Sequence, residues 1–554
     1  MSARHLVIGI DGADWDVVDA IGAARLPTLA SLRARGAWAR LESVVPPATL
    51  PNWTTFLTGV DPGAHGVFDF TRREGYRVRF TSGAARAVPT WLARLDAAGL
   101  SCAMLSFPGT YPPEKLAHGV VISGWDSPVA FEADRSFVSP ADAFDALTER
   151  FGPLRFDEVD EFDTASAGFH ERLGDALALK VERKTELFEH VLGERAWDVL
   201  ACYFGETDTA SHHLAAFFDP RSPRRPAAPP ARAVDGIPRV YEAIDRALAR
   251  LMERAGPGVE LTLVSDHGSG PSSDRVVFLD RALEAAGLLR FLPRRAGAAI
   301  SRLAKEAALT VLPPRLKERA FGAMGRALPG WLESRARFGA IDFSRTKLFS
   351  EELNYFPSIC VNERGREPAG TVDPSERPAM RRQLETAMRA IVDPWTGERI
   401  VRAVHAREDL YFGPEVRHAP DFVLELALDE RGASYNVMPS GGPGPVVDRL
   451  PEHEWLGRKG RSLQGAHRSH GLFLAAGPSV RAAGEVTAHI ADASATCLAR
   501  IGSRLPESAG RVLSEILTSQ PAPVVLPAQG AAPRAERPEL ARTEARLRAL
   551  GYFE

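Results

Sequence analysis

The run Leu6-Val7-Ile8-Gly9-Ile10, which ends in Asp11, is the stretch that most strongly indicates the fold. Its residues are continuously apolar and do not alternate with polar ones, which is typical of a strand buried on both faces of a sheet. Similar runs recur, each followed by a helical pattern, at residues 101–106, 119–123, 198–204, 260–265, 421–426 and 471–476. This alternation predicts an α/β fold with a largely parallel central sheet flanked by helices.

Residue types that bind metals follow three of these runs. Asp11 ends the first run, Asp208 lies shortly after residues 198–204, and Asp266 and His267 close a third. Binding groups gather beyond the carboxyl ends of parallel strands, so these distant residues are expected to be neighbours. The pattern predicts a site for two metal ions.

Two of these segments have a residue spacing that suits metal binding, and each also has an explanation without a metal. Asp208 and His212 are four residues apart, so a helix would place both on one face, where they can bind one ion. An acidic helix cap and a surface histidine are the alternative. Asp266-His267 precedes Gly268, which permits close approach of the backbone to a ligand. A tight turn without a metal is the alternative there.

Two further histidines, His467 and His470, stand just before the run at residues 471–476. Either one offers an imidazole ligand at the start of a strand. Spacing alone does not choose between them.

Thr49 is the candidate nucleophile. Pro51 suits the first turn of a helix, where its missing N–H costs nothing, so Thr49 should lie at or just before the positive end of that helix. A phosphoryl group held there would meet backbone N–H groups, and the amide of Asn52 could donate to one of its oxygens. On this segment alone, a threonine that only caps the helix is the commoner use.

Taken together, the segments resemble the alkaline phosphatase superfamily, and within it the type I phosphodiesterase/nucleotide pyrophosphatase family. The motifs occur in the family's order and cover most of residues 1–500. They are Ile10-Asp11-Gly12, Thr49-Leu50-Pro51-Asn52, Leu57-Thr58-Gly59, His65-Gly66, residues 208–212, Ser265-Asp266-His267-Gly268 and Gly465-Ala466-His467.

The resemblance implies an alkaline-phosphatase-like core with two divalent metal ions, usually zinc, with manganese as an alternative. It assigns one ion to Asp208, His212 and His467. It assigns the other to Asp11, Asp266 and His267, and this second ion would also bind and activate Thr49. The family places its histidine two residues after a glycine, which favours His467, after Gly465, and leaves His470 as the fallback.

The function expected from this resemblance is hydrolysis of phosphate esters, of phosphodiesterase or nucleotide pyrophosphatase type, through a phosphothreonine intermediate. A phosphomonoesterase or a phosphomutase on the same scaffold is an alternative, because metals and nucleophile do not distinguish one ester substituent from two. A non-catalytic protein that binds metal or phosphate is an alternative of another class. A sulfatase fits poorly, because its nucleophile is a modified cysteine or serine and position 49 is threonine.

Length, net charge and cysteine content indicate which partners and which cellular location to expect. The 554 residues carry a formal charge of -3 with a pI near 6.6, so a small phosphate ester is expected as the partner and a nucleic acid polymer is not. The four cysteines form no C-x-x-C pair, which favours reduced thiols. The first apolar run is too short for a signal peptide, and no run approaches the roughly 20 apolar residues of a membrane span. A cytoplasmic location is expected, and the sequence does not indicate the oligomeric state.

The chain divides into a catalytic domain and three additions. The catalytic domain is expected over residues 1–290 and 341–510, with a helical insertion at 291–340, a Pro/Ala-rich tether at 519–537 and a docking helix at 538–554. Between residues 294 and 337 the insertion holds ten basic residues against three glutamates, so it could act as a lid that attracts an anionic substrate, or touch a membrane surface. The alternative is an ordinary solvated helical face.

Overall fold

The structure is a computed structural model. It describes residues 3–81, 83–124, 134–152, 154, 164, 166–293, 334–335, 337–457, 463–519 and 523–527. Most of the insertion expected at 291–340, most of the tether at 519–537 and all of the docking helix at 538–554 lie outside the described residues. Their expected roles therefore stay predictions.

The central sheet has ten strands in the order β19-β2-β18-β9-β1-β8-β5-β6-β7, with β20 paired to β2. Each pair of neighbouring strands from β9 to β6 in this order is parallel, which confirms the predicted largely parallel sheet. In that order the strands are Gly484–Glu485, Ala37–Glu42, His470–Ala476, Glu260–Val264, Ala3–Ile10, Trp197–Phe204, Cys102–Leu105, Val120–Ile122 and Val138–Ser139, and β20 is Ala488–His489.

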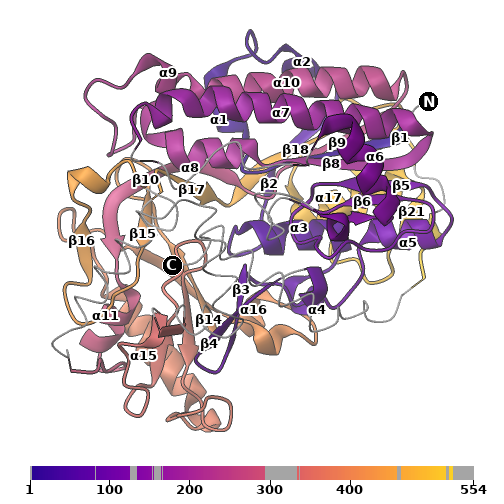
Figure 1. Ribbon diagram of the computed structural model, residues 1–554. Coiled ribbons are helices and arrows are strands. Elements are labelled where there is room, and N and C mark those ends of the chain that lie inside the picture. The colour runs from indigo at the N-terminus through magenta and orange to yellow at the C-terminus, as the bar shows by residue number, and fades with distance from the viewer. Residues whose placement is uncertain are drawn as a thin grey trace.

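Helices cover both faces of this sheet (Figure 1). Along β1, Leu6 and Ile8 point into one apolar core and Val7 into the other, as the alternation of strand side chains requires. The first core packs under α1 (Trp15–Ile21), α2 (Pro27–Arg35), α6 (Ala141–Phe151), α7 (Phe169–Glu194), α8 (Glu206–Phe218), α9 (Ala231–Val234) and α10 (Gly236–Ala255). The second packs against α3 (Thr49–Thr58), α5 (Trp91–Ala97) and α17 (Ile490–Arg500).

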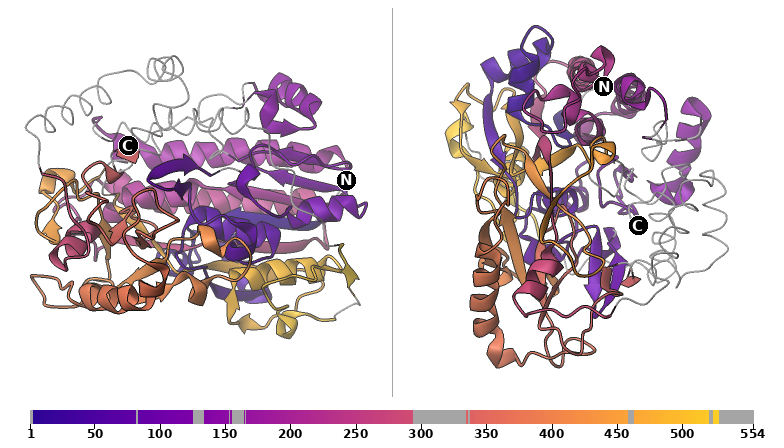
Figure 2. Two further views of the ribbon diagram at one scale, coloured as in Figure 1. Left: turned by 90° about the horizontal axis from the view of Figure 1, so that it is seen from below. Right: turned by 90° about the vertical axis from the view of Figure 1, so that its left-hand side faces the viewer.

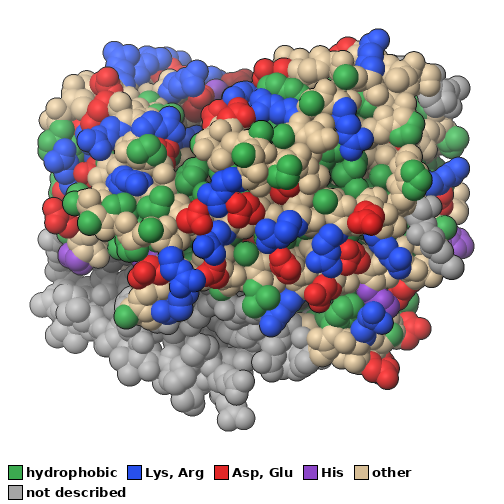
Figure 3. Space-filling model, turned by 90° about the horizontal axis from the view of Figure 1, so that it is seen from above, with side chains coloured by type: hydrophobic (Ala, Val, Ile, Leu, Met, Phe, Trp, Pro, Cys, Tyr) green, Lys and Arg blue, Asp and Glu red, His purple; other side chains and the backbone are tan. Residues whose placement is uncertain are grey.

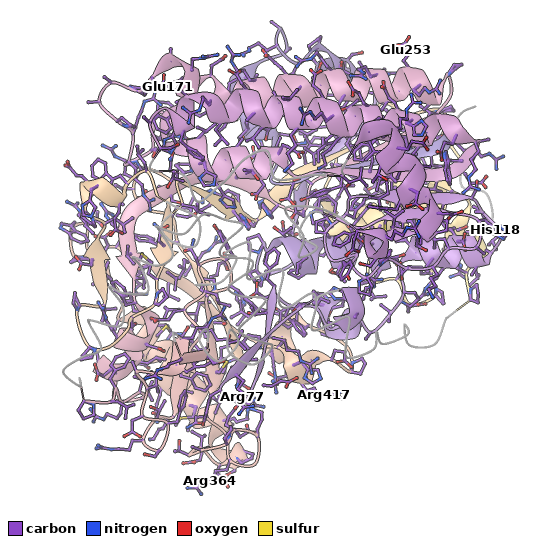
Figure 4. The ribbon with its side chains drawn as sticks, viewed as in Figure 1. Arg77, His118, Glu171, Glu253, Arg364 and Arg417 are labelled. Atoms are coloured by element: carbon purple, nitrogen blue, oxygen red, sulfur yellow. The ribbon has the colours of Figure 1, made fainter. Side chains whose placement is uncertain are left out.

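The long helices α7 and α10 lie side by side over the first core. Figure 4 shows Glu171, near the start of α7, and Glu253, near the end of α10, at opposite ends of this layer. Seen from above, basic and acidic side chains are interspersed on this face (Figure 3). Ion pairs join the two helices at Arg239–Asp175 (2.7 Å), Arg246–Glu182 (2.9 Å) and Arg250–Glu189 (2.5 Å).

In the part of the chain that the structure describes, every helix is too short or too polar to cross a bilayer.

The apolar run at residues 471–476 forms β18, which lies in the central sheet but is antiparallel to both β9 and β2. Its residue Phe473 pairs with Val264, the last residue of β9, so β18 enters the sheet at the edge where the parallel strands end. This direction matters for function. A parallel strand would have placed the residues before it, including His467, at the opposite edge.

The run at residues 421–426 forms a strand, β14 (Phe422–Leu426), but it lies outside the central sheet. The sequence pattern did not show this, because an apolar run indicates burial and not the choice of partner strand. Its sheet is antiparallel, of order β11-β12-β14-β13. We call this sheet and its helices the second lobe (Figure 2). Its other elements are β11 (Leu348–Ser350), β12 (Ser358–Val361), β13 (Val401–Ala406), α11 (Leu279–Ala285) and α15 (Arg377–Arg389).

A third sheet connects the lobe to the edge where the parallel strands end. It has the order β15-β10-β16, with β17 also paired to β10. Its strands are β10 (Gly268–Val277), β15 (Ser434–Val437), β16 (Val447–Arg449) and β17 (Gly465–Arg468). Ser269 pairs with His467, so the segments that follow Asp266 and precede β18 are joined directly.

Two buried carboxyl groups, Asp280 on α11 and Glu352 after β11, lie close together inside the second lobe. Burial and the neighbouring Glu352 raise the pKa of Asp280 well above its usual range, and burial raises the pKa of Glu352 to about 7. The folded protein therefore holds protons that the unfolded chain releases near pH 4, so this pair lowers stability progressively as pH rises above 4.

We expect Asp280→Asn to be more stable than the wild type at about pH 8 and little changed at about pH 4. Asparagine keeps the oxygen that accepts from the backbone N–H of Ser350 at 2.7 Å, and it removes one of the two like charges. Urea unfolding of both proteins across this pH range measures the difference. A difference that does not grow with pH would contradict the assignment.

Candidate metal centre

The carboxylates predicted to meet do meet at one edge of the central sheet. The register pairs Ile10 with Phe204 and Gly9 with Val264, so β1, β8 and β9 end together. Asp11 follows β1 directly and Asp266 lies two residues beyond β9. After β8 the chain turns at once into α8, whose first turn carries Asp208.

The first group of ligand types is Asp208, His212 and His467, whose ligand atoms all lie within 4.8 Å of one another. His212 Nε2 lies 3.1 Å from Asp208 Oδ2, and His467 Nε2 lies 3.7 Å from Asp208 Oδ1. His470, the alternative to His467, is exposed at the start of β18 and is not in either group.

The second group adjoins the first and shares a member with it. Asp11, Asp208 and His267 also offer ligand atoms within 4.8 Å of one another. Asp266 lies beside them, with its Oδ2 3.3 Å from His267 Nε2, which is itself 3.4 Å from Asp11 Oδ1. Asp208 thus lies between the two groups.

The charges of this centre are poorly balanced by protein groups. Asp11 Oδ1, Asp208 Oδ1 and Asp266 Oδ2 are buried and accept no hydrogen bond from the described residues. Burial and Asp208 raise the pKa of Asp11 to about 8, and burial with Asp11 and Asp208 raises the pKa of Asp266 well above its usual range. Burial lowers the pKa of His267 to about 4, so its imidazole is neutral. Buried carboxylates beside neutral imidazoles are a donor set that suits divalent cations.

All three imidazoles are held in the tautomer that metal binding requires. The Nδ1 atoms of His212, His267 and His467 lie 3.1, 2.9 and 2.8 Å from the backbone carbonyls of Gly465, Gly268 and Pro47. A carbonyl only accepts, so each Nδ1 donates its proton and each Nε2 lone pair is left for the centre.

Thr49 faces this centre from the start of α3. Its hydroxyl lies 3.4 Å from His267 Nε2, and the residue is 7% exposed. The N-cap of α3 is Ala48, and no side chain caps the helix. The alternative in which Thr49 is only a helix cap is therefore wrong: Thr49 is the first helical residue, and its hydroxyl lies beside His267 of the candidate centre.

A family model described as type I phosphodiesterase / nucleotide pyrophosphatase matches residues 5–440. The chain belongs to this family. Solved structures similar to it include murine and human ectonucleotide pyrophosphatase / phosphodiesterase 5, at 14% and 13% identity and TM-scores of 0.46 and 0.47. Each alignment covers 93% of this chain and 100% of the other chain. A further murine structure is an inactive variant in complex with AMP.

Membership of the type I phosphodiesterase family supports hydrolysis of phosphate esters as the activity of this chain. The motifs at Leu57-Thr58-Gly59 and His65-Gly66 contribute to packing: Leu57 lies in the second apolar core. His65 is fully buried, and its Nε2 lies 3.0 Å from the hydroxyl of Thr55.

Asn52 holds the backbone around Thr49. Its Oδ1 accepts from the N–H of Val44 and its Nδ2 donates to the carbonyl of Ala48, both at 2.8 Å. The side chain is fully buried. The structure therefore shows Asn52 fixing the loop before Thr49, and a direct contact with phosphate stays a prediction.

Two residues beside Asp11 were not predicted from the sequence of this phosphodiesterase family member. Trp53 Nε1 and the hydroxyl of Tyr203 donate to Asp11 Oδ2, at 3.0 and 2.5 Å. They orient the carboxylate so that Oδ1 is the oxygen directed to the centre. Trp53 is four residues after Thr49 in the same helix, which is the only sequence signal that could have suggested it.

A buried ion pair fixes the start of α8. Lys184 Nζ lies 3.1 Å from Glu206 Oε1, and burial lowers the pKa of Lys184 although Glu206 opposes this. We expect Lys184→Met to lower the free energy of unfolding by about 3 kcal/mol, because it leaves Glu206 buried beside the more distant Lys180, at 3.8 Å.

The double variant Lys184→Met with Glu206→Gln should recover most of that loss, because it removes the buried charge as well. Urea unfolding of the three proteins measures both effects. A double variant as unstable as the single one would show that the pair acts through shape and not through charge.

Proposed function

We propose that this chain is a metal-dependent hydrolase of phosphate esters, of phosphodiesterase or nucleotide pyrophosphatase type, that acts through a phosphothreonine. One observation carries the proposal: the hydroxyl of Thr49 lies 3.4 Å from His267 Nε2, at the N-terminus of a helix and beside buried carboxylates, each with one oxygen that accepts no hydrogen bond from the described residues. Family membership supports the class of reaction.

The donor set divides between two divalent ions, zinc or manganese. Asp208, His212 and His467 would hold one ion, and Asp11, Asp266 and His267 the other. Bound there, the ions would lower the pKa of the nucleophile's hydroxyl and neutralise charge on the phosphoryl oxygens.

The chemical role of Thr49 follows from its position. Its Oγ1 attacks phosphorus in line with the leaving oxygen, so that the Oγ1–P bond forms as the bond to the leaving group breaks. The hydroxyl loses its proton and the leaving alcohol gains one. Water then cleaves the Oγ1–P bond, which restores the threonine and releases the phosphorylated product.

The first turn of α3 would bind the phosphoryl oxygens. The backbone N–H groups of Thr49 and Leu50 belong to that turn and have no acceptor within the helix. They point along the helix axis, where the dipole favours negative charge. Asn52 keeps this geometry through its two backbone hydrogen bonds.

A substrate panel tests the proposal. Bis-p-nitrophenyl phosphate, p-nitrophenyl phosphate and a dinucleotide pyrophosphate would be compared with zinc, with manganese and with a chelator. We expect the diester or the pyrophosphate to be hydrolysed faster than the monoester. Hydrolysis of the diester and of the pyrophosphate should stop when the chelator removes the metal. Preference for the monoester, or transfer of its phosphate to an added alcohol, would indicate a monoesterase or mutase. Bound metal without any turnover would indicate a non-catalytic protein.

We also propose a cytoplasmic location, with a small phosphate ester as substrate. All four cysteines are free thiols in the protein interior, which suits a reducing compartment. Cell fractionation with an antibody to the protein checks this. Recovery of the protein with the membrane or outside the cell would contradict it.

A further inference from the structure

The ring of His467 is stacked between two other rings. On one side lies His267, with ring centroids 3.6 Å apart and planes 19° apart. On the other side lies Tyr355, at 4.4 Å and 17°. The same Tyr355 ring also contacts His212, at 5.4 Å and 49°. One aromatic side chain therefore touches both histidines of the first metal group.

Tyr355 comes from a part of the chain that holds no metal ligand. It lies between β11 and β12, in the second lobe. His212 lies on α8 and His467 on the short strand β17. The contact is thus made by the lobe on a centre that the central sheet builds.

The orientation of the His467 ring depends on this stack. On the Nδ1 side, the ring donates to the carbonyl of Pro47 at 2.8 Å. A single hydrogen bond fixes the tautomer but leaves the ring free to tilt about that bond. Flat packing against Tyr355 restricts this tilt and directs Nε2 toward Asp208.

The segment before Tyr355 is held in a strained conformation. Glu352 has a φ of 51°, in the left-handed region that favours glycine. Its carboxylate accepts from the N–H of Asp280 at 3.0 Å and from the hydroxyl and N–H of Ser440. The Ser350 hydroxyl accepts from the N–H of Glu352 at 2.9 Å. Such backbone strain persists only where the surroundings fix the residue.

The residues on either side of Tyr355 are anchored as well. Asn354 Oδ1 accepts from the N–H of Val437 at 2.8 Å. Phe356 is buried in a cluster with Phe68 and Tyr411. The lobe therefore presents Tyr355 on a rigid segment.

We propose that Tyr355 is a positioning residue: through its stack on His467, the second lobe sets the metal affinity of the group formed by Asp208, His212 and His467. The inference rests on the proposed function only in that this group holds a divalent ion. The ring contacts of Tyr355 are to His212 and His467, which belong to this group, so the ion proposed for Asp11, Asp266 and His267 should not depend on Tyr355.

Zinc affinity measured by competition with a chromogenic chelator tests the proposal, with cobalt(II) absorption as a second readout. We expect Tyr355→Ala to lower the affinity for one of the two ions about 10- to 100-fold and to leave the affinity for the other unchanged. The absorption band of cobalt(II) bound in place of the weakened ion should shift in this variant. Tyr355→Phe should match the wild type, because the stack needs the ring and not the hydroxyl.

Tyr76→Ala is the matched control. Tyr76 is a half-buried tyrosine that packs on Phe343 at 3.6 Å and donates to Asn362, away from the metal ligands. It should lower stability without changing either metal affinity. Glu352→Ala releases the strained segment and keeps the Tyr355 ring. It should lower the affinity for the same ion as Tyr355→Ala does.

Unchanged affinity for both ions in Tyr355→Ala would overturn the proposal. A change of KM for one leaving group alone, with metal affinity unaltered, would overturn it too and would show that Tyr355 contacts substrate. If Tyr76→Ala lowered the affinity for that ion as much as Tyr355→Ala does, the loss of affinity would come from a general loss of stability in the second lobe, and the proposal would be wrong. If the wild type binds two ions but cleaves no phosphate ester, the proposed function fails while this inference is still decided by the affinities.

Discussion

Thr49→Ala should lower kcat/KM for a phosphodiester on the order of 10³-fold or more, while both metal ions stay bound. The variant removes the one oxygen placed to attack phosphorus, whereas the six carboxylate and imidazole ligands remain. Steady-state kinetics and metal analysis on the same preparation measure the two quantities together. Because alanine fits the first turn of α3, the fold should be preserved.

Thr49→Ser is the control for this prediction. Serine keeps a hydroxyl at the same position, so a substantial part of the activity should return. Rapid acid quenching with a phosphorus-labelled substrate should trap label on the wild type and on Thr49→Ser, and none on Thr49→Ala. Full activity in Thr49→Ala would show that water attacks directly and that Thr49 is not the nucleophile.

Asp208→Ala should cost at least as much activity, about 10³-fold or more, but for a different reason. Asp208 is proposed to bind one ion and also belongs to the second group of ligand types, beside Asp11 and His267, so its loss should weaken binding of both ions. Zinc content after dialysis against a weak chelator should therefore fall below that of a variant such as Asp11→Ala, which belongs to one group.

A control on the same helix separates metal loss from damage to α8. Asp219 lies at the C-terminal end of α8 and pairs with Arg221 at 2.8 Å, outside the centre. Asp219→Ala should keep both ions and the activity. Normal metal content in Asp208→Ala would contradict the position assigned to Asp208 between the two groups.

Much of the site could be predicted from the sequence because its signals are local. The apolar run before Asp11 has no alternation, and this pattern is enough to predict a strand buried on both faces. Asp208 and His212 are four residues apart, and helix geometry alone brings them to one face. The order of these motifs along the chain was enough to predict the family, which the match over residues 5–440 confirms.

Other features depend on which segments pair, and a local pattern carries no information on that. The runs at 421–426 and 471–476 look alike in the sequence, yet one lies in the second lobe and the other runs antiparallel beside β9. The direction of β18 places His467 at the candidate metal centre and leaves His470 exposed.

By itself, then, the sequence determined the fold class, the family and the residue types of a candidate metal site, since periodicity and short spacings are properties of neighbouring residues. Only the tertiary structure decided which atoms act together. Asn52 turned out to hold backbone, Trp53 and Tyr203 to orient Asp11, and Tyr355 to stack on His467. Each of these contacts except the first two joins residues more than 100 positions apart, and such pairs become neighbours only through the burial and strand pairing of the whole chain.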